Sequence, residues 1–177
     1  MLVAVQSGSA SVKVRVEFDK EFQFRNARTV GWGASPGAVM VGRGPDDDAD
    51  DINRRAKPII VDAVNAEMPK HGLEPALGTP DLTVTYYLLL TIGDSSQTLG
   101  QFLPPVTKWA IPPFNASTTS LKVIQEGSLV LDLSSGGQPV WRGVGQAEIK
   151  MGMDEDKRAA LIREAVREIL KRYPPRK

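Results

Sequence analysis

The side chains of this chain best suited to catalysis are those of its aspartates. The segment 46–51 holds five of them, while Asp19 ends one predicted strand and Asp132 lies inside another. General acid–base catalysis needs two carboxyl groups held in different environments, so either set could supply a pair. Clustered aspartates on a Gly/Pro-rich loop are more typical of a solvated acidic tract, and an aspartate at a strand end usually caps a turn. We therefore expect structural roles for these carboxylates and predict no enzymatic activity.

His71 is the only histidine, and the chain has no cysteine. A transition-metal site would have to be built from carboxylates, and a serine nucleophile would have only this one histidine as its base. His71 comes at the end of a predicted helix, just before Gly72, where an imidazole favours the helix dipole. The segment 46–51 also lacks the spaced ligands of a calcium loop. We predict no metal site, no catalytic residue and no cofactor.

Three aromatic residues lie in a long, weakly charged connection at 93–120 that is rich in Gly, Ser, Thr and Pro. Structureless loops of this length are uncommon inside compact domains and tend to be functional. Phe102, Trp109 and Phe114 would cost stability if they were left bare, so they should cover the chain's own sheet, pack on another copy or meet a ligand. We take these three as speculative binding residues and keep all three alternatives.

Trp141 and Arg142 invite a binding-site interpretation, because arginine can hold anions and tryptophan can stack on ligands. Neighbouring strand residues point to opposite faces of a sheet. The alternation therefore favours Trp141 as a core residue between sheet and helix, with Arg142 on the opposite face. Gly143 and Gly145 follow within the same predicted strand, where glycine marks a bulge or close packing.

The charges of the chain almost cancel: 22 lysines and arginines stand against 21 aspartates and glutamates, for a formal net charge of +1. Such a balance gives no global field that would recruit nucleic acid or a membrane surface. The basic residues near the C-terminus are interrupted by Glu164 and Glu168, which offer helix-spaced partners, so a solvated helix face is favoured. We predict no nucleic-acid partner.

Hydrophobic spacing predicts the strands and helices on which these residues lie. Period-two alternation predicts strands at 12–19, 28–32, 82–92, 129–133 and 140–149. Helical spacing predicts a helix over 52–71, which either begins near Pro58 or bends there, and a last helix capped by Asp154 and stopped by Pro174. The segment 33–51 is interpreted as a solvated loop. These elements predict an α+β fold: a single, largely antiparallel sheet of about five strands, with two helices packed on one face.

One domain accounts for the whole pattern, because no linker separates two patterned halves. We assign residues 12–177 to this domain and residues 1–11 to an N-terminal tail or signal-peptide remnant. The first ten residues, MLVAVQSGSA, combine a short apolar run with small residues that a signal peptidase accepts, but they lack a positive n-region.

An ordered set of motifs resembles the bacterial domain-of-unknown-function family 4136, whose members are typically predicted envelope lipoproteins. The stretch VEFDKEFQFRNARTVGWG resembles the family's opening strand-turn-strand, with Asp19 ending the first strand and Trp32 the second. Pro80-Asp81-Leu82 resembles its central strand. Gly127-Ser128-Leu129 and Val140-Trp141-Arg142-Gly143 resemble its hairpin, and Tyr173-Pro174-Pro175 resembles its helix terminus.

The resemblance implies a periplasmic or outer-membrane location, with the cytoplasm left open, and supplies no catalytic residues. Many family members carry a lipid-modified cysteine that this sequence lacks, so peripheral membrane association would need an anchor absent from this sequence. We predict a non-enzymatic interaction or structural module of the bacterial cell envelope. The alternative is a small-molecule or lipid-binding domain with an apolar pocket under the 93–120 loop. The partner would be an unknown protein or a small apolar ligand.

Overall fold

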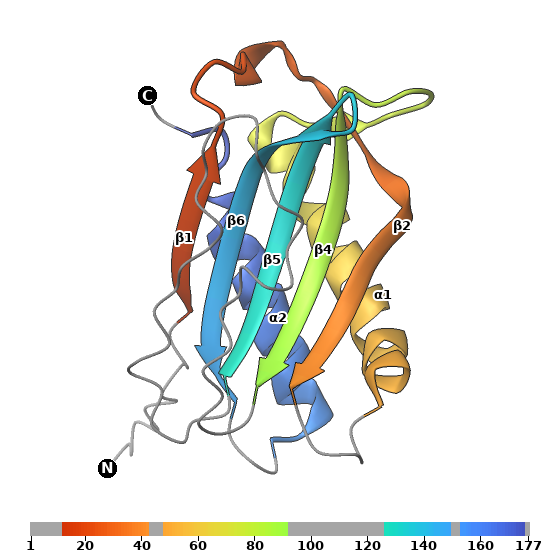
Figure 1. Cartoon of the computed structure of the whole chain (residues 1–177), viewed down its shortest axis with the longest axis vertical. Coiled ribbons are helices and arrows are strands. Elements are labelled where there is room, and N and C mark those ends of the chain that lie inside the picture. Colours follow the sequence, from red (N-terminus) through yellow and green to blue (C-terminus); the bar gives the residue numbers. More distant parts are fainter. Residues whose placement is uncertain (1–11, 43–47, 92–125, 150–152, 176–177) are drawn as a thin grey trace, which may run out of the picture.

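The computed structural model describes residues 12–42, 48–91, 126–149 and 153–175. These ranges form one mixed six-stranded sheet with two helices packed against a single face (Figure 1). The predicted α+β class, with both helices on one side, is therefore confirmed. Neither helix of these ranges is long and apolar enough to cross a membrane.

The sheet is antiparallel along most of its width. Strands lie in the order β1 (Lys13–Phe18), β6 (Gln138–Glu148), β5 (Glu126–Ser135), β4 (Leu82–Thr91), β2 (Thr29–Gly42) and β3 (Glu74–Pro75). The first three pairings are antiparallel, and the two that involve β2 are parallel. The parallel β2–β4 pair exists because the chain between these strands crosses over through a helix. The two-residue β3 is the sixth strand, which the sequence did not predict.

Strand β2 runs much further than its sequence indicates. The prediction ended it at Trp32 and assigned 33–51 to a loop, which is wrong for residues 33–42. The pairing with β4 is interrupted after Trp32 and resumes at Gly37. At Gly37 the ring of Tyr86 occupies the space that a β-carbon would fill. Glycine and proline therefore serve a strand irregularity and a close contact here, although in isolation they indicate a loop.

Helix α1 (Ala49–Glu67) begins well before Pro58, at Asp48, whose side chain accepts a hydrogen bond from the Asp50 backbone N–H (2.9 Å). Pro58 lies on the exposed side of the helix. A short 3-10 helix (Met68–His71) follows and ends at Gly72, which adopts the left-handed conformation (φ +81°). Glycine adopts this conformation without strain and is therefore a common residue at the end of a helix.

Helix α2 (Glu155–Leu170) starts at its predicted cap, Asp154, whose carboxylate accepts from the Lys157 backbone N–H (2.8 Å). It lies across β6, where Ile169 approaches Gly143 and Gly145 so closely that a β-carbon at Gly143 would clash. The predicted close packing at these glycines is confirmed. Both helices bury one apolar stripe against the sheet, and the buried core side chains include Ile60, Val64, Tyr86, Leu131, Trp141, Val166 and Ile169.

Candidate functional site

The two faces of the sheet differ in what covers them. The described helices pack on one face, whose side chains belong to the hydrophobic core. The other face, called the open face here, carries no helix or strand from the described ranges (Figure 1). Strand alternation and the pairing register assign to it the side chains of Lys13, Arg15, Glu17, Thr83, Thr85, Tyr87, Leu89, Ser128, Val130, Asp132, Arg142, Val144 and Gln146.

A buried ion pair lies in the middle of the open face. Asp132 of β5 and Arg142 of β6 are directly opposite each other in the hairpin. Arg142 Nε donates to Asp132 Oδ1 at 2.7 Å, and its Nη2 donates to Oδ2 at 2.6 Å. The two residues are only 2% and 4% exposed. This two-bond geometry is the strongest that arginine and a carboxylate can make, and it fixes both side chains.

The electrostatics of the pair follow from its burial. Burial raises the pKa of the Asp132 carboxyl, and the hydrogen bonds and charge of Arg142 oppose that rise. Burial alone would lower the pKa of Arg142, but the hydrogen bonds and negative charge of Asp132 raise it above its usual value. Both groups can stay charged in this environment only because each neutralises the other.

Polar neighbours extend the pair into a row that crosses four strands. Glu17 of β1 lies opposite Arg142, and Thr85 of β4 lies opposite Asp132. Burial raises the pKa of Glu17, while Arg15 and Arg142 oppose the rise. The Glu17 atom Oε2 is buried without a hydrogen-bond partner. Burial also raises the pKa of the Tyr87 hydroxyl, and the negative charge of Asp132 adds to that effect.

Apolar side chains flank this row. Val130, Val144 and Leu89 are all buried on the open face, next to the half-buried Tyr87. Both oxygens of Asp132 accept a hydrogen bond from Arg142, whose positive charge opposes protonation of this carboxylate. Within the described ranges, no group of three metal-ligating side chains comes together. The arrangement is an apolar layer with the ion pair as its fixed polar centre, and half-buried side chains beside it are accessible to a partner.

The structure does not join Asp19 and Asp132, the first carboxylate pair considered from the sequence. Asp19 follows the end of β1, where its Oδ1 accepts from the Glu21 backbone N–H (2.8 Å) and its own N–H donates to the Val140 carbonyl (2.9 Å). Asp19 is therefore the turn cap that the sequence indicated, and Asp132 belongs to Arg142.

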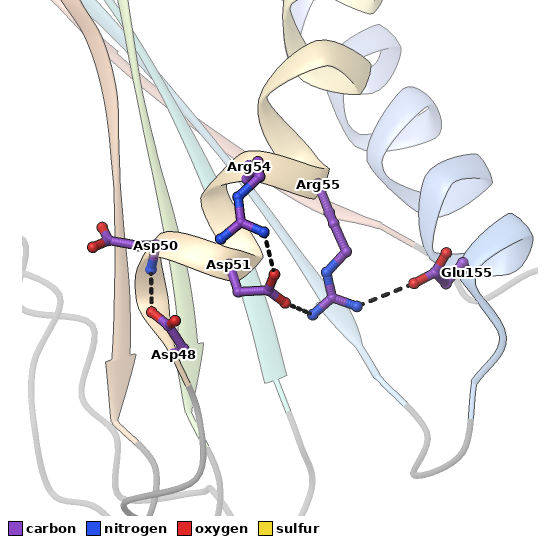
Figure 2. Close-up of polar contacts among 6 residues, drawn as sticks. All are labelled: Asp48, Asp50, Asp51, Arg54, Arg55 and Glu155. Atoms are coloured by element: carbon purple, nitrogen blue, oxygen red, sulfur yellow. Dashed lines mark hydrogen bonds and ion pairs between the residues drawn. The ribbon is translucent and has the colours of Figure 1, made fainter.

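Figure 2 shows what the second carboxylate set does. Asp48 caps α1, and the Asp51 carboxylate contacts Arg55 at 2.7 Å. Arg55 also contacts Glu155 at 3.1 Å, which links the first turns of the two helices. These side chains are well exposed, so solvent weakens each pair. The prediction of a solvated loop is wrong from Asp48 onward, because these aspartates begin a helix, whereas 46–47 lie outside the described residues.

Some of the remaining predicted residues lie in the described ranges, and others lie outside them. Trp141 is fully buried in the core and Arg142 points to the other face, so that prediction is confirmed. His71 is half-buried in the last helical turn before Gly72. The speculative binding residues Phe102, Trp109 and Phe114 lie outside the described residues.

Sequence reasoning named both members of the ion pair but did not pair them. The hairpin turn is Gly136-Gly137, and a regular two-residue turn would place Asp132 opposite Trp141. An irregularity after Leu133 leaves one extra residue in β6 and shifts the register, so that Asp132 faces Arg142 instead. The sequence did contain one signal of a buried charge, which is the single aspartate among the leucines of β5.

The comparisons with known proteins agree with the fold. No curated protein matches the chain. A PDZ domain protein from Parabacteroides distasonis has a similar structure (TM-score 0.56, 12% identity), over 95% of this chain but only 38% of that one. A DUF4136 family protein from Bacteroides thetaiotaomicron is similar over 92% of this chain and 96% of that one (TM-score 0.54, 16% identity). A PelC dodecamer from Paraburkholderia phytofirmans matches at a TM-score of 0.40, with 12% identity over 94% and 100% of the two chains.

The family comparison covers nearly the whole chain. The model of the family described as "Domain of unknown function (DUF4136)" matches residues 14–175, which include every described helix and strand except the first residue of β1. The earlier resemblance in the strand-turn-strand, the hairpin and the helix terminus is thereby confirmed, and the chain belongs to the DUF4136 family.

Proposed function

We propose that this chain is a non-enzymatic interaction or structural domain of the bacterial cell envelope, and that it meets its partner through the open face. The observation that carries this proposal is the composition of that face. A fixed, buried Asp132–Arg142 pair lies among Val130, Val144 and Leu89, on the side of the sheet opposite both helices. These central side chains are almost inaccessible in the chain itself, so the half-buried Thr83, Thr85 and Tyr87 around them would make the contact.

The roles of the carboxylates support a non-enzymatic function. General acid–base work requires a carboxyl that is free to exchange a proton with a substrate. Asp19 and Asp48 instead accept backbone N–H bonds, Asp51 pairs with Arg55, and Asp132 is held by Arg142. These four of the aspartates that suggested catalysis in the sequence are thus occupied in holding the fold, whereas 46–47 lie outside the described residues.

Membership of the DUF4136 family supports the envelope location, because members are typically predicted envelope lipoproteins. A domain anchored beside a membrane meets partners in a crowded, quasi-planar space. The face of a six-stranded sheet is broad enough for extended contact with another protein there.

A second candidate function is the binding of a small apolar molecule or lipid, in a pocket between the open face and the 93–120 segment. Val130 and Val144 would supply apolar side chains to such a pocket, since both lie on this face. Ligand pockets are mostly apolar with a few fixed polar groups, and the Asp132–Arg142 pair with Tyr87 would supply those groups.

Site-specific crosslinking separates the two candidates. A photoreactive amino acid at Thr83, half-buried on the open face, should give one discrete protein adduct in the envelope fraction of the native host. The same amino acid at Arg163, exposed on α2, serves as the control and should give none. Adducts of equal pattern from both positions, or none from Thr83, would contradict an interface on the open face.

The binding alternative has its own readout. Thermal-shift and native-mass measurements would compare wild type with Trp109→Ala against phospholipids, peptidoglycan fragments, metal ions and common metabolites. A molecule that stabilises wild type but not Trp109→Ala would favour the pocket, because a ligand that binds only the folded state raises its stability. An unchanged melting temperature across the panel, together with a Thr83 adduct, would favour the interaction domain.

A further inference from the structure

Strand β1 has a strand partner on one side only among the described ranges, because β6 is its single neighbour and β1 lies at the edge of the sheet. The Asp19 backbone N–H donates to the Val140 carbonyl, so odd-numbered residues of this segment direct their backbone groups toward β6. The N–H and C=O groups of Val14, Val16 and Phe18 therefore point away from the sheet. An edge of this kind is a template for pairing with another strand.

The sequence of this edge is self-complementary. Its open-face side chains are Lys13, Arg15 and Glu17, and Asp19 follows the strand, so the positive half precedes the negative half. Val16 stands at the centre. An antiparallel copy of the strand, centred on Val16, would place each Arg15 opposite the other copy's Glu17 and each Lys13 opposite the other copy's Asp19.

We propose that two copies of this chain associate through β1, as an antiparallel pair about a two-fold axis at Val16, and so form a continuous twelve-stranded sheet. The alternation of backbone groups that point toward β6 and away from it fits this register. Val16 would bond to Val16 of the other copy, and Val14 to Phe18, which are the residues whose backbone groups point outward. Arg15 and Glu17 then fall at non-hydrogen-bonded positions, where opposite side chains come closest.

The side chains favour the same arrangement. Opposite charges directly across a strand pair stabilise it, whereas like charges destabilise it. On the helix-covered side, Val14, Val16 and Phe18 are only partly buried, and a second copy would bury them further.

The helices leave room for this dimer. Ile169 places α2 over Gly143 and Gly145 of β6. The two copies of β6 would be three strand spacings apart, about 14 Å. Packed helices need only about 8–10 Å between their axes. A two-fold axis also gives each copy the same contact, as closed dimers require.

The contact is small, which sets the expected affinity. The segment from Lys13 to Asp19 is shorter than the roughly 20–30 residues that a stable interface takes from each partner. The dimer should therefore dissociate on dilution. Sedimentation or light-scattering measurements over a wide range of concentration should give a mass that rises toward that of two chains.

Charge reversal tests the register directly. Arg15→Glu puts like charges opposite each other, and Glu17→Arg does the same with the other sign, so each should weaken the dimer by about tenfold or more. The double variant Arg15→Glu/Glu17→Arg restores opposite charges and should dimerise like wild type. An equimolar mixture of the two single variants should form a mixed dimer, because each supplies the charge that the other lacks.

Two further variants test whether net charge or unfolding, rather than the β1 contact, accounts for a weaker dimer. Arg163→Glu changes the net charge equally on an exposed part of α2 and should leave the dimer unchanged. Val16→Pro removes an N–H that points away from β6, so it should abolish dimerisation while circular dichroism stays that of the folded chain. A wild type that stays monomeric at every concentration would overturn the proposal, as would a dimer that is indifferent to all three β1 changes. A chain that dimerises only when residues 1–11 are removed would also overturn it, because those residues would then occupy the edge.

Discussion

The helix-covered face and the open face of the same sheet are stabilised in different ways. On the covered face, Leu131, Trp141 and Ile169 are buried among other apolar side chains, and glycines let the helix approach. Contacts of this kind are numerous and non-directional, so hydrophobic burial supplies most of the stability. On the open face, the central contact is the directional pair Asp132–Arg142.

The difference shows what each face can specify. A hairpin of alternating residues can shift by two positions and still keep its apolar side chains on the core side. Such a shift would separate Asp132 from Arg142 and leave two buried charges without partners. We interpret the ion pair as the contact that selects one register for a hairpin whose Gly-Gly turn and irregularity after Leu133 would otherwise permit others.

Arg142→Met gives the largest effect expected from this comparison. It leaves the Asp132 carboxylate buried and unpaired, which should lower the free energy of unfolding by about 3–5 kcal/mol. The double variant Asp132→Leu/Arg142→Met should regain most of that loss, since buried ion pairs can be replaced by apolar residues with little cost. Urea denaturation measures both values.

An exposed pair provides the control for this experiment. Arg55→Ala removes contacts to Asp51 and Glu155 at the ends of the two helices, where solvent screens the charges, and should cost no more than about 1 kcal/mol. If Arg142→Met costs as little as Arg55→Ala, the open face has no special polar centre and the comparison fails.

Gly143→Ala tests the covered face in the same strand. Its new methyl group would enter the space of Ile169, and overpacking of a core costs about 1–3 kcal/mol. Combining it with Ile169→Ala, which removes the Cγ2 atom that the new methyl group would meet, should cost less than the two single changes added together in the same denaturation assay. Gly136→Ala would be a misleading control, because that glycine has a positive φ of 56° and would add backbone strain. Equal stability of Gly143→Ala and wild type would show that the helix can move away at no cost.

Elements with clear periodicity could be predicted from the sequence, and those that depend on pairing could not. The strand at 82–92 and the helix capped by Asp154 agree with β4 and α2 because alternation and capping are local signals. The second half of β2 was missed. Its Gly, Ala, Ser and Pro residues carry no strand preference, and the pairing with β4 that extends the strand resumes only at Gly37.

The candidate site shows the same limit. Alternation alone separated Trp141 from Arg142 and so assigned each to the correct face. The partner of Arg142 depended on one extra residue in β6, and no local preference reveals such a residue. The turn role of Asp19 was predicted because it is local, whereas the burial of Asp132 was not, because it depends on the neighbouring strands.

Tyr173→Phe gives the smallest effect and asks whether the covered face contains a polar contact of its own. The Tyr173 hydroxyl is buried without a hydrogen-bond partner, and its ring packs edge-on against Trp141, with 5.9 Å between the ring centroids. Loss of an unpaired hydroxyl should leave stability at neutral pH unchanged or slightly higher. Tyr86→Phe is the matched control, because the Tyr86 hydroxyl donates to Asn53 at 2.6 Å and its loss should cost about 0.5–1.5 kcal/mol.

Alkaline pH sharpens this last test. Burial raises the pKa of Tyr173 from 10.0 to about 12, so the folded chain favours the neutral phenol more than the unfolded chain does. The contribution of this group is therefore complete below pH 10 and disappears as the pH rises through about 12. Tyr173→Phe should lose less stability than wild type between these values in denaturation measured at successive pH. Identical pH profiles would show that the Tyr173 hydroxyl is solvated in the folded chain. That result would contradict its burial on the covered face of the sheet.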